Sequence, residues 1–246
     1  MENHQGIRLS HILIRVSDLS SAVADYRAAG FTVTLGADPA SAHNAMIYFE
    51  DGAFLELFTP PKTSRLTLIA ASVLLGKAAA ARFRLWTQPG EGFVEYAFES
   101  VSPKLAAEVV RLRAAGVRTS RALSRARQRL DNRKVRWQLS FPDNLELPFV
   151  MSAYDPPDEQ SESARVHANG AKKIVGLHIE HPQPQDLGEE LQRFIGGHPS
   201  DHGISLSQGG RYMIDRVTIA GLQEPVDASK MHGAKILPYL RATADQ

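Results

Sequence analysis

The chain has 246 residues, enough for one large domain or two small ones with a buried core. It carries 28 basic and 27 acidic residues with a formal net charge of +1, so its overall charge favours no particular class of partner. It contains no cysteine, which excludes disulfide bonds, thiolate nucleophiles and zinc–thiolate sites.

Targeting signals are not evident in the sequence. Residues 1–8 are polar and lack the apolar core of a signal peptide. The longest apolar run, residues 66–75, is far shorter than the roughly 20 residues that span a bilayer. We therefore expect a cytoplasmic protein with no membrane partner.

The first predicted unit spans residues 7–60. Residues 9–16 alternate with period two, which predicts a strand with Ile12, Ile14 and Val16 on one face and Leu9, His11, Leu13 and Arg15 on the other. An amphipathic helix follows, with Asp18 as its N-cap and Gly30 just beyond its end. Three more strands are expected over residues 31–35, 44–50 and 53–59, the last two joined by an Asp-Gly turn.

Glu56 is the most unusual residue of this unit. It lies on the last strand, on the same face as Phe54 and Phe58. Burying a carboxylate between two aromatic side chains costs several kcal/mol unless something pairs with it. We therefore expect a cavity or a pairing partner on this face, and Arg15 is the partner that the alternation of the first strand offers.

The same order of elements recurs in residues 91–154, after a connecting helix expected over residues 64–82. The predicted elements are a strand at 93–99, a helix from Pro103 to Gly116, a strand from Val117 onward, and strands at 135–141 and 145–154 joined by a turn at 142–144. Repetition of a whole supersecondary unit is stronger evidence than any single strand. We expect residues 7–160 to form one domain of two βαβββ units.

Residues 118–136 hold eight basic residues and one acidic residue, Asp131. One interpretation is a solvated hairpin arm. Another is an edge of a pocket that meets an anionic substrate. Nucleic acid is the least favoured partner because no aromatic residues are interleaved with the charges.

A third, incomplete unit is predicted over residues 165–222, after a polar linker at 155–163. It has a strand at 173–181, a helix at 186–195, and strands at 203–207 and 211–220 that we expect to form a hairpin. His178 precedes Gln185 by the same spacing that separates His11 from Asp18. Residues 223–246 are expected to form an irregular tail with a short helix at 236–241.

Two consecutive βαβββ units, with His on the first strand and Glu on the fourth, resemble the vicinal oxygen chelate superfamily, the fold of glyoxalase I, extradiol dioxygenases and bleomycin-resistance proteins. Within it, the chain is similar to the glyoxalase-like domain family. The resemblance covers roughly residues 7–200 and implies an α+β fold in which the two units form a cupped mixed sheet. The motifs that carry it are His-Asn-Ala-Met-Ile-Tyr-Phe at 43–49, Asp-Gly at 51–52 with Leu-Glu-Leu at 55–57, Gly-Glu-Gly-Phe-Val-Glu-Tyr-Ala at 90–97, Val-Arg-Trp-Gln-Leu at 135–139, Leu-Pro-Phe at 147–149, and His-Ala-Asn-Gly-Ala at 167–171.

The resemblance also implies a site at the bottom of the cup. In metal-dependent relatives each end strand of each unit gives one ligand to a divalent ion, here Mn²⁺, Fe²⁺, Ni²⁺ or Zn²⁺ if any is bound. By position, His11 and Glu56 are the ligands from the first unit. Glu95 and a residue near Ser152 or Glu146 would come from the second unit, which lacks the usual histidine. Glu56 and Glu95 would then shuttle protons beside a Lewis-acidic ion.

Three functions remain open at this stage. The first is a metal-dependent lyase, isomerase or dioxygenase acting on a small oxygenated molecule. The second is a metal-free binding protein with a pocket lined by Phe54, Phe58, Tyr96 and Trp137, and the third is a protein-interaction module in the last unit. A homodimer is a further expectation from the resemblance. Candidate ligand contacts, each with a structural role as the alternative, are Asn44, Tyr96, Trp137, His167, Asn169 and His178.

Overall fold

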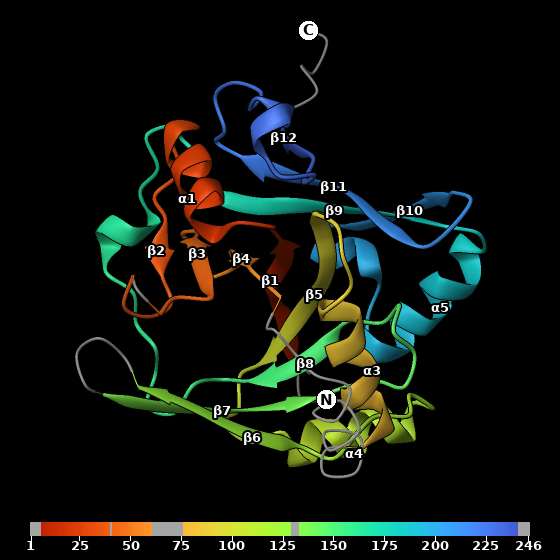
Figure 1. Cartoon of the computed structure of the whole chain (residues 1–246). Coiled ribbons are helices and arrows are strands. Elements are labelled where there is room, and N and C mark those ends of the chain that lie inside the picture. The colour runs from red at the N-terminus through yellow and green to blue at the C-terminus, as the bar shows by residue number, and fades with distance from the viewer. Residues whose placement is uncertain (1–5, 40, 61–75, 129–132, 241–246) are drawn as a thin grey trace, which may run out of the picture.

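The computed structural model of the chain describes residues 6–39, 41–60, 76–128 and 133–240. Within them lie an eight-stranded sheet of order β2-β3-β4-β1-β5-β8-β7-β6 and a four-stranded sheet of order β10-β9-β11-β12. Figure 1 shows the larger sheet curled into an open cup, with the smaller sheet lying across the ends of β1 and β5. The structure confirms a cupped α+β fold.

The first unit has the predicted order of elements, and the structure shows that β1 pairs with β4 in parallel. Its elements are β1 (Ile7–Arg15), α1 (Leu19–Ala28), β2 (Thr34–Leu35), β3 (Asn44–Tyr48) and β4 (Phe54–Phe58). The Asp18 carboxylate accepts the Ser21 N–H at 2.7 Å and caps α1. Strand β2 is shorter than predicted because the backbone N–H groups of Phe31 and Thr32 bond to Tyr26 O and to the His167 ring instead of to a strand.

A bulge in β1 corrects one detail of the predicted alternation. The pairing of β1 with its antiparallel neighbour shifts between Leu9 and His11. As a result Leu9 packs with the main core instead of sharing the face of His11. The extra residue, Ser10, turns its hydroxyl to Nδ1 of His11 at 3.0 Å.

The second unit repeats the first, and β5 pairs β8 in parallel as β1 pairs β4. Its elements, with the helix that precedes it, are α3 (Lys77–Trp86), β5 (Gly92–Ser100), α4 (Ala106–Ala114), β6 (Leu123–Gln128), β7 (Lys134–Ser140) and β8 (Phe149–Ser152). The first part of the predicted 64–82 helix lies outside the described residues, and the described part continues to Trp86. Strand β8 starts later than predicted because the carbonyls of Leu145 and Leu147 accept hydrogen bonds from Arg82.

The third segment corrects two predictions. Its elements are β9 (Lys173–His181), α5 (Pro184–Ile195), β10 (Ile204–Gln208), β11 (Met213–Ala220) and β12 (Ile236–Pro238). The expected hairpin of β10 and β11 does not form, because β10 pairs with β9 in parallel and β11 pairs with the other edge of β9. An amphipathic helix between β9 and β10 provides the crossover that a parallel pair requires. The short helix expected at 236–241 is instead strand β12, paired with β11.

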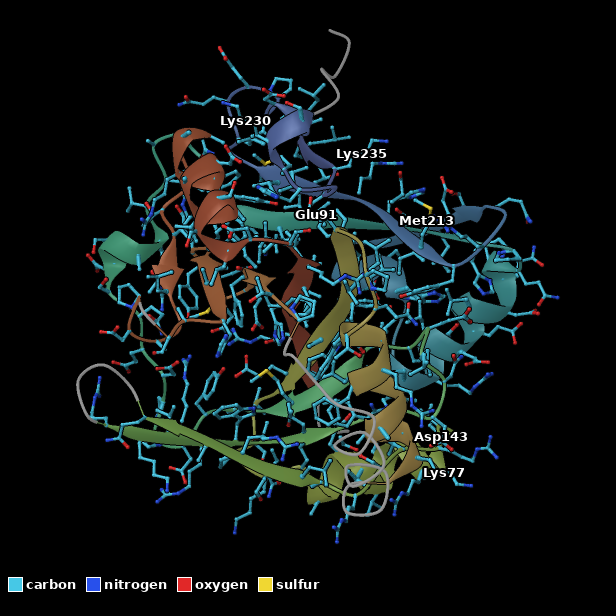
Figure 2. All side chains as sticks on the ribbon, in the orientation of Figure 1. Lys77, Glu91, Asp143, Met213, Lys230 and Lys235 are labelled. Atoms are coloured by element: carbon cyan, nitrogen blue, oxygen red, sulfur yellow. The ribbon has the colours of Figure 1, made fainter. Side chains whose placement is uncertain are left out.

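The two faces of the large sheet pack differently. On the convex face, Ile12, Ile14 and Phe98 join α1, α5 and the second sheet in the main core. Figure 2 labels Glu91 just before β5, beneath the C-terminal segment that carries Lys230 and Lys235. On the concave face, α3 packs two alanines of its buried side against the sheet and fills one end of the cup. The remainder of the concave face surrounds a cavity.

None of the described helices combines the length and the apolar character needed to cross a bilayer.

Candidate functional site

The floor of the cavity brings His11 and Glu56 together. The parallel register of β1 and β4 sets His11 opposite Phe54 and Leu13 opposite Glu56. The distance from Nε2 of His11 to Oε2 of Glu56 is 3.7 Å. Asn44 on β3 donates its amide N–H to Oε1 of Glu56 at 2.7 Å. Asn44, and not Arg15, is therefore the partner of this carboxylate, since Arg15 donates to the carbonyls of Leu85, Pro89 and Gly90.

Burial decides the charge state of these groups. His11 is 5% exposed, and desolvation lowers its pKa to about 3. It is therefore neutral near pH 7, and its proximity to Glu56 is not an ion pair. Burial also raises the pKa of Glu56, an effect that the Asn44 hydrogen bond and the charge of Arg127 oppose. The floor is a neutral imidazole beside a carboxyl whose proton is held more tightly than usual.

Aromatic side chains fix the imidazole. The ring of His11 stacks on Phe54 with centroids 4.6 Å apart and planes 8° apart. Phe149 meets the His11 ring in an edge-to-face arrangement, with centroids 5.5 Å apart. Because Ser10 also contacts Nδ1, the ring has one orientation and presents Nε2 to the cavity.

The cavity above this floor has a volume of about 490 Å³. Most of its lining is apolar or aromatic, and both tryptophans of the chain contribute to it. Arg127 of β6 is the one cationic lining side chain of the described residues. The lining residues are His11, Leu13, Gly36, His43, Asn44, Met46, Tyr48, Phe54, Glu56, Phe58, Thr59, Trp86, Arg127, Trp137, Leu139, Phe149, Met151 and Tyr154.

A sequence comparison identifies the family. A family model described as a glyoxalase-like domain matches residues 9–195, most of the chain. The chain belongs to the glyoxalase-like domain family. No curated protein matches the sequence of this glyoxalase-like chain.

Solved structures support the same fold. A hypothetical protein from Staphylococcus aureus superposes with a TM-score of 0.69 at 15% identity, over 95% of this chain and 100% of that one. A Mn(II)-bound glyoxalase from Novosphingobium aromaticivorans has a TM-score of 0.52 at 12% identity, over 87% of this chain and 65% of that one. The 2,3-dioxygenase LapB from Pseudomonas sp. KL28 has a TM-score of 0.51 at 11% identity, over 87% and 75%. At these identities the likeness shows the vicinal oxygen chelate fold alone.

The internal repeat allows the expected metal ligands of this glyoxalase-like chain to be tested. Gly30 and Gly116 end equivalent helices, and their spacing equals that between His11 and Ala97, which lie opposite each other on β1 and β5. Because His11 pairs with Phe54 and Ala97 pairs with Phe149, the counterpart of Glu56 is Met151. The second unit thus offers a methyl group and a thioether where the first offers an imidazole and a carboxylate.

A four-ligand centre does not fit this donor set. Alanine cannot ligate, and a thioether is a soft ligand that suits Cu(I) better than the divalent ions expected here. Within the described ranges, no three His, Cys, Asp or Glu side chains lie where they could hold one metal ion. The alternatives considered from the sequence lie elsewhere, since Glu146 contacts His181 at 3.3 Å and the Ser152 hydroxyl bonds to Gln138 N at 2.9 Å.

Glu95 is held by a buried network beside the cavity. It is 2% exposed and pairs with Arg82 of α3, which is fully buried. The Trp86 indole N–H donates to Oε2 of Glu95 at 2.5 Å. Glu95 therefore lies behind the tryptophan that lines the cavity. Tyr96, its neighbour, points to the opposite face and is fully buried in the main core.

Three of the other candidate contacts are engaged outside the cavity. His167 accepts the Thr32 N–H and bonds to Tyr48 O at 2.9 Å. Asn169 donates to Ala29 O at the end of α1. Both ring nitrogens of His178 form hydrogen bonds with serine hydroxyls of β10, in the second sheet. Nδ1 bonds to Ser205 and Nε2 bonds to Ser207. Of the predicted ligand-binding residues, Asn44 and Trp137 line the cavity.

Sequence reasoning did not single out Arg127, Tyr154 or Trp86. Arg127 pairs with Asp158, and its guanidinium lies 5.8 Å from the centre of the Tyr154 ring. A signal for Arg127 was present, because it has the same parity along β6 as Leu123, which is buried in the concave cluster. No comparable signal exists for Trp86, because its position depends on how α3 packs inside the cup.

Proposed function

We propose that the chain binds a small organic molecule that combines an apolar or aromatic ring with a hydroxyl group. The observation that carries this proposal is the 3.7 Å separation of His11 Nε2 and Glu56 Oε2 at the end of an apolar cavity. The separation is too long for a direct hydrogen bond. A single polar group placed between Nε2 of His11 and Oε2 of Glu56 could therefore form a hydrogen bond with each of them.

A hydroxyl group is suited to this gap in either protonation arrangement. If Glu56 is ionised and Nε2 carries the proton, the hydroxyl donates to the carboxylate and accepts from the imidazole. If Glu56 is protonated and Nε2 is bare, the same hydroxyl accepts from the carboxyl and donates to the imidazole. Because a hydroxyl is both donor and acceptor, it satisfies both residues, which a carboxylate or an ammonium group does not.

The remaining lining supports a ring. Ligand cavities typically measure about 300–1,000 Å³ and combine apolar walls with a few converging polar groups. The volume of about 490 Å³ and the aromatic walls from Phe54, Phe149, Trp86 and Trp137 match this description. Burial of a ring between them supplies the binding energy, and the hydroxyl sets its orientation.

Tryptophan fluorescence provides the test, because the chain has two tryptophans and both line the cavity. Phenol and toluene are titrated against the wild type, Glu56→Ala and His11→Ala. Phenol is expected to bind the wild type and to lose about tenfold in affinity in each variant, since leaving a buried donor or acceptor without its partner costs about 1–3 kcal/mol. Toluene, which lacks the hydroxyl, is expected to bind all three proteins alike.

The matched control is Glu189→Gln, which removes an exposed carboxylate from α5. It is expected to leave both affinities unchanged. The proposal is wrong if the wild type binds phenol no better than toluene, or if both cavity variants keep the full preference for phenol.

A metal-dependent lyase, isomerase or dioxygenase is the second candidate. His11 and Glu56 are close enough to contact one ion, and a Mn(II)-bound glyoxalase shares the fold. Ala97 and Met151 weigh against it, so our proposal assigns no step to a metal. Elemental analysis of protein purified without a histidine tag separates the two. Near-stoichiometric transition metal that disappears in the His11→Ala, Glu56→Ala double variant would favour the second candidate.

A further inference from the structure

A second cavity adjoins the one described above. Its volume is about 300 Å³, and it lies under residues 157–160, which follow β8. Three aromatic side chains, Tyr48, Phe54 and Tyr154, line both cavities. The two spaces are therefore neighbours on either side of the same rings.

An ion pair completes the boundary between them. Arg127 lines the first cavity and Asp158 lines the second, and the two side chains pair with each other. The Asp158 side chain is 3% exposed and the Arg127 side chain is 24% exposed, so the carboxylate is the better shielded partner. The boundary between the two cavities thus consists of three aromatic rings and one ion pair. All of these groups belong to side chains, which changes of rotamer can move.

Two charged residues that line the second cavity have no ion-pair partner among the described residues: Glu159, which is exposed, and Arg165. Arg8 pairs with Glu99 at 3.3 Å, and Asp158 pairs with Arg127. Arg165 also lines this cavity, and among the described residues no carboxylate lies within ion-pair distance of it. Its Nε is buried without a hydrogen-bond partner there. A buried donor of this kind destabilises the protein until it finds an acceptor.

The backbone that carries Arg165 is firmly placed. Arg165 ends a one-turn helix (Glu162–Arg165), and the preceding Ala164 packs against Met46, Tyr48 and Phe54. Figure 1 shows this segment running between the β6–β7 arm and the first unit. Arg165 is thus attached to the same side chains that divide the cavities.

We infer that the second cavity is a subsite for the anionic end of an elongated ligand, and that Arg165 binds its carboxylate. The ring and hydroxyl of that ligand lie in the first cavity, and a short chain passes the Tyr154 side of the boundary. A planar guanidinium binds a carboxylate through two parallel hydrogen bonds, which gives this end of the site its specificity. The inference rests on the proposed function and names its substrate class as hydroxyaryl alkanoic acids.

The experiment uses phenol and a series of 4-hydroxyphenyl alkanoic acids with one to five methylene groups, each beside its neutral primary amide. Tryptophan fluorescence measures the affinities for the full-length wild type, Arg165→Gln, Arg165→Lys and Arg211→Gln. In the wild type, one chain length is expected to bind about tenfold or more tightly as the acid than as the amide. Arg165→Gln is expected to remove that preference and leave phenol binding unchanged, which also shows that the variant is folded.

The other two variants act as controls. Arg165→Lys keeps the charge and is expected to retain part of the preference. Arg211→Gln removes an exposed arginine of the second sheet region and is expected to change nothing. The inference is overturned if no acid exceeds its amide in the wild type, or if the preference persists in Arg165→Gln. Failure of phenol itself to bind would instead contradict the proposed function.

Discussion

Replacement of Glu95 by Gln separates a residue that holds the cavity wall from one that contacts the ligand. Gln keeps the size of the side chain and an oxygen that accepts the Trp86 indole N–H. It removes the negative charge that faces Arg82, whose side chain has no exposure to water. In this variant the buried guanidinium of Arg82 keeps only its hydrogen bonds to backbone carbonyl groups.

The expected cost follows from that loss. Removing one partner of a buried ion pair typically costs about 3–5 kcal/mol. Arg82 keeps hydrogen bonds to Asn144 O at 2.9 Å and Leu147 O at 2.7 Å, so we expect the lower end, about 3 kcal/mol. For a chain of this size each kcal/mol lowers Tm by roughly 2–4 °C, which gives a fall of roughly 6–12 °C.

Urea unfolding followed by circular dichroism measures this directly. Glu50→Gln is the matched control, because its pair with Lys172 is exposed on both sides and is worth less than about 1 kcal/mol. The Arg82→Met, Glu95→Leu double variant, which replaces the pair with apolar side chains, is expected to recover most of the loss. The reasoning is refuted if Glu95→Gln unfolds within about 1 kcal/mol of the wild type while phenol binding falls.

Three further predictions concern the cavity floor. Burial lowers the pKa of His11 to about 3, so below about pH 6.5 the unfolded chain binds one proton more than the folded chain. The free energy of unfolding therefore falls as the pH drops from 6.5 toward 3, by up to about 1.4 kcal/mol per pH unit. Urea unfolding at pH 7 and pH 4.5 should show a smaller fall in this free energy for His11→Phe than for the wild type or the control His198→Gln. Burial raises the pKa of Glu56, so the stability that its protonated form contributes is lost as the pH rises through the folded-state pKa. Glu56→Gln should therefore have a higher Tm than the wild type at pH 8, and the difference in Tm should be smaller at pH 4. An equal difference at both pH values would contradict this. A Cβ on Gly36 would lie 2.1 Å from Oδ1 of Asn44; Gly36→Ala should weaken phenol binding as much as Asn44→Ala, and additive losses in the double variant would rule out a shared cause.

The periodicity of the sequence correctly predicted which residues share a face of the sheet. It did not predict which helices and strands pack against that face. The alternation of residues 9–16 and 54–58 correctly turned His11 and Glu56 to one side of the sheet. Their meeting requires β1 to pair with β4 in parallel, which the two strands alone do not specify. The resemblance implied only that both residues belong to one site. The same alternation turned Glu95 to the concave side, but its partner comes from α3, whose packing no local pattern encodes.

The errors in the third segment have a related cause. Strands β9, β10 and β11 were located because their apolar residues alternate, but their partners depend on the connections. The short, Gly-containing link between β10 and β11 favoured a hairpin, whereas the helix α5 carries the chain to the edge of β9 that β10 occupies. Strand β12 is a three-residue edge strand, too short for any periodicity to be visible.

The two βαβββ units contribute different side chains to the cavity floor, and this difference affects how a ligand could be oriented there. The fold is duplicated, yet the imidazole, the carboxyl and the amide on the floor all belong to the first copy. In the second copy, Ala97 and Met151 stand at the positions of His11 and Glu56. A molecule turned end for end would set its oxygen against a methyl group and a thioether and lose both hydrogen bonds. Although the scaffold is nearly symmetric, the proposed ligand would therefore bind in only one orientation.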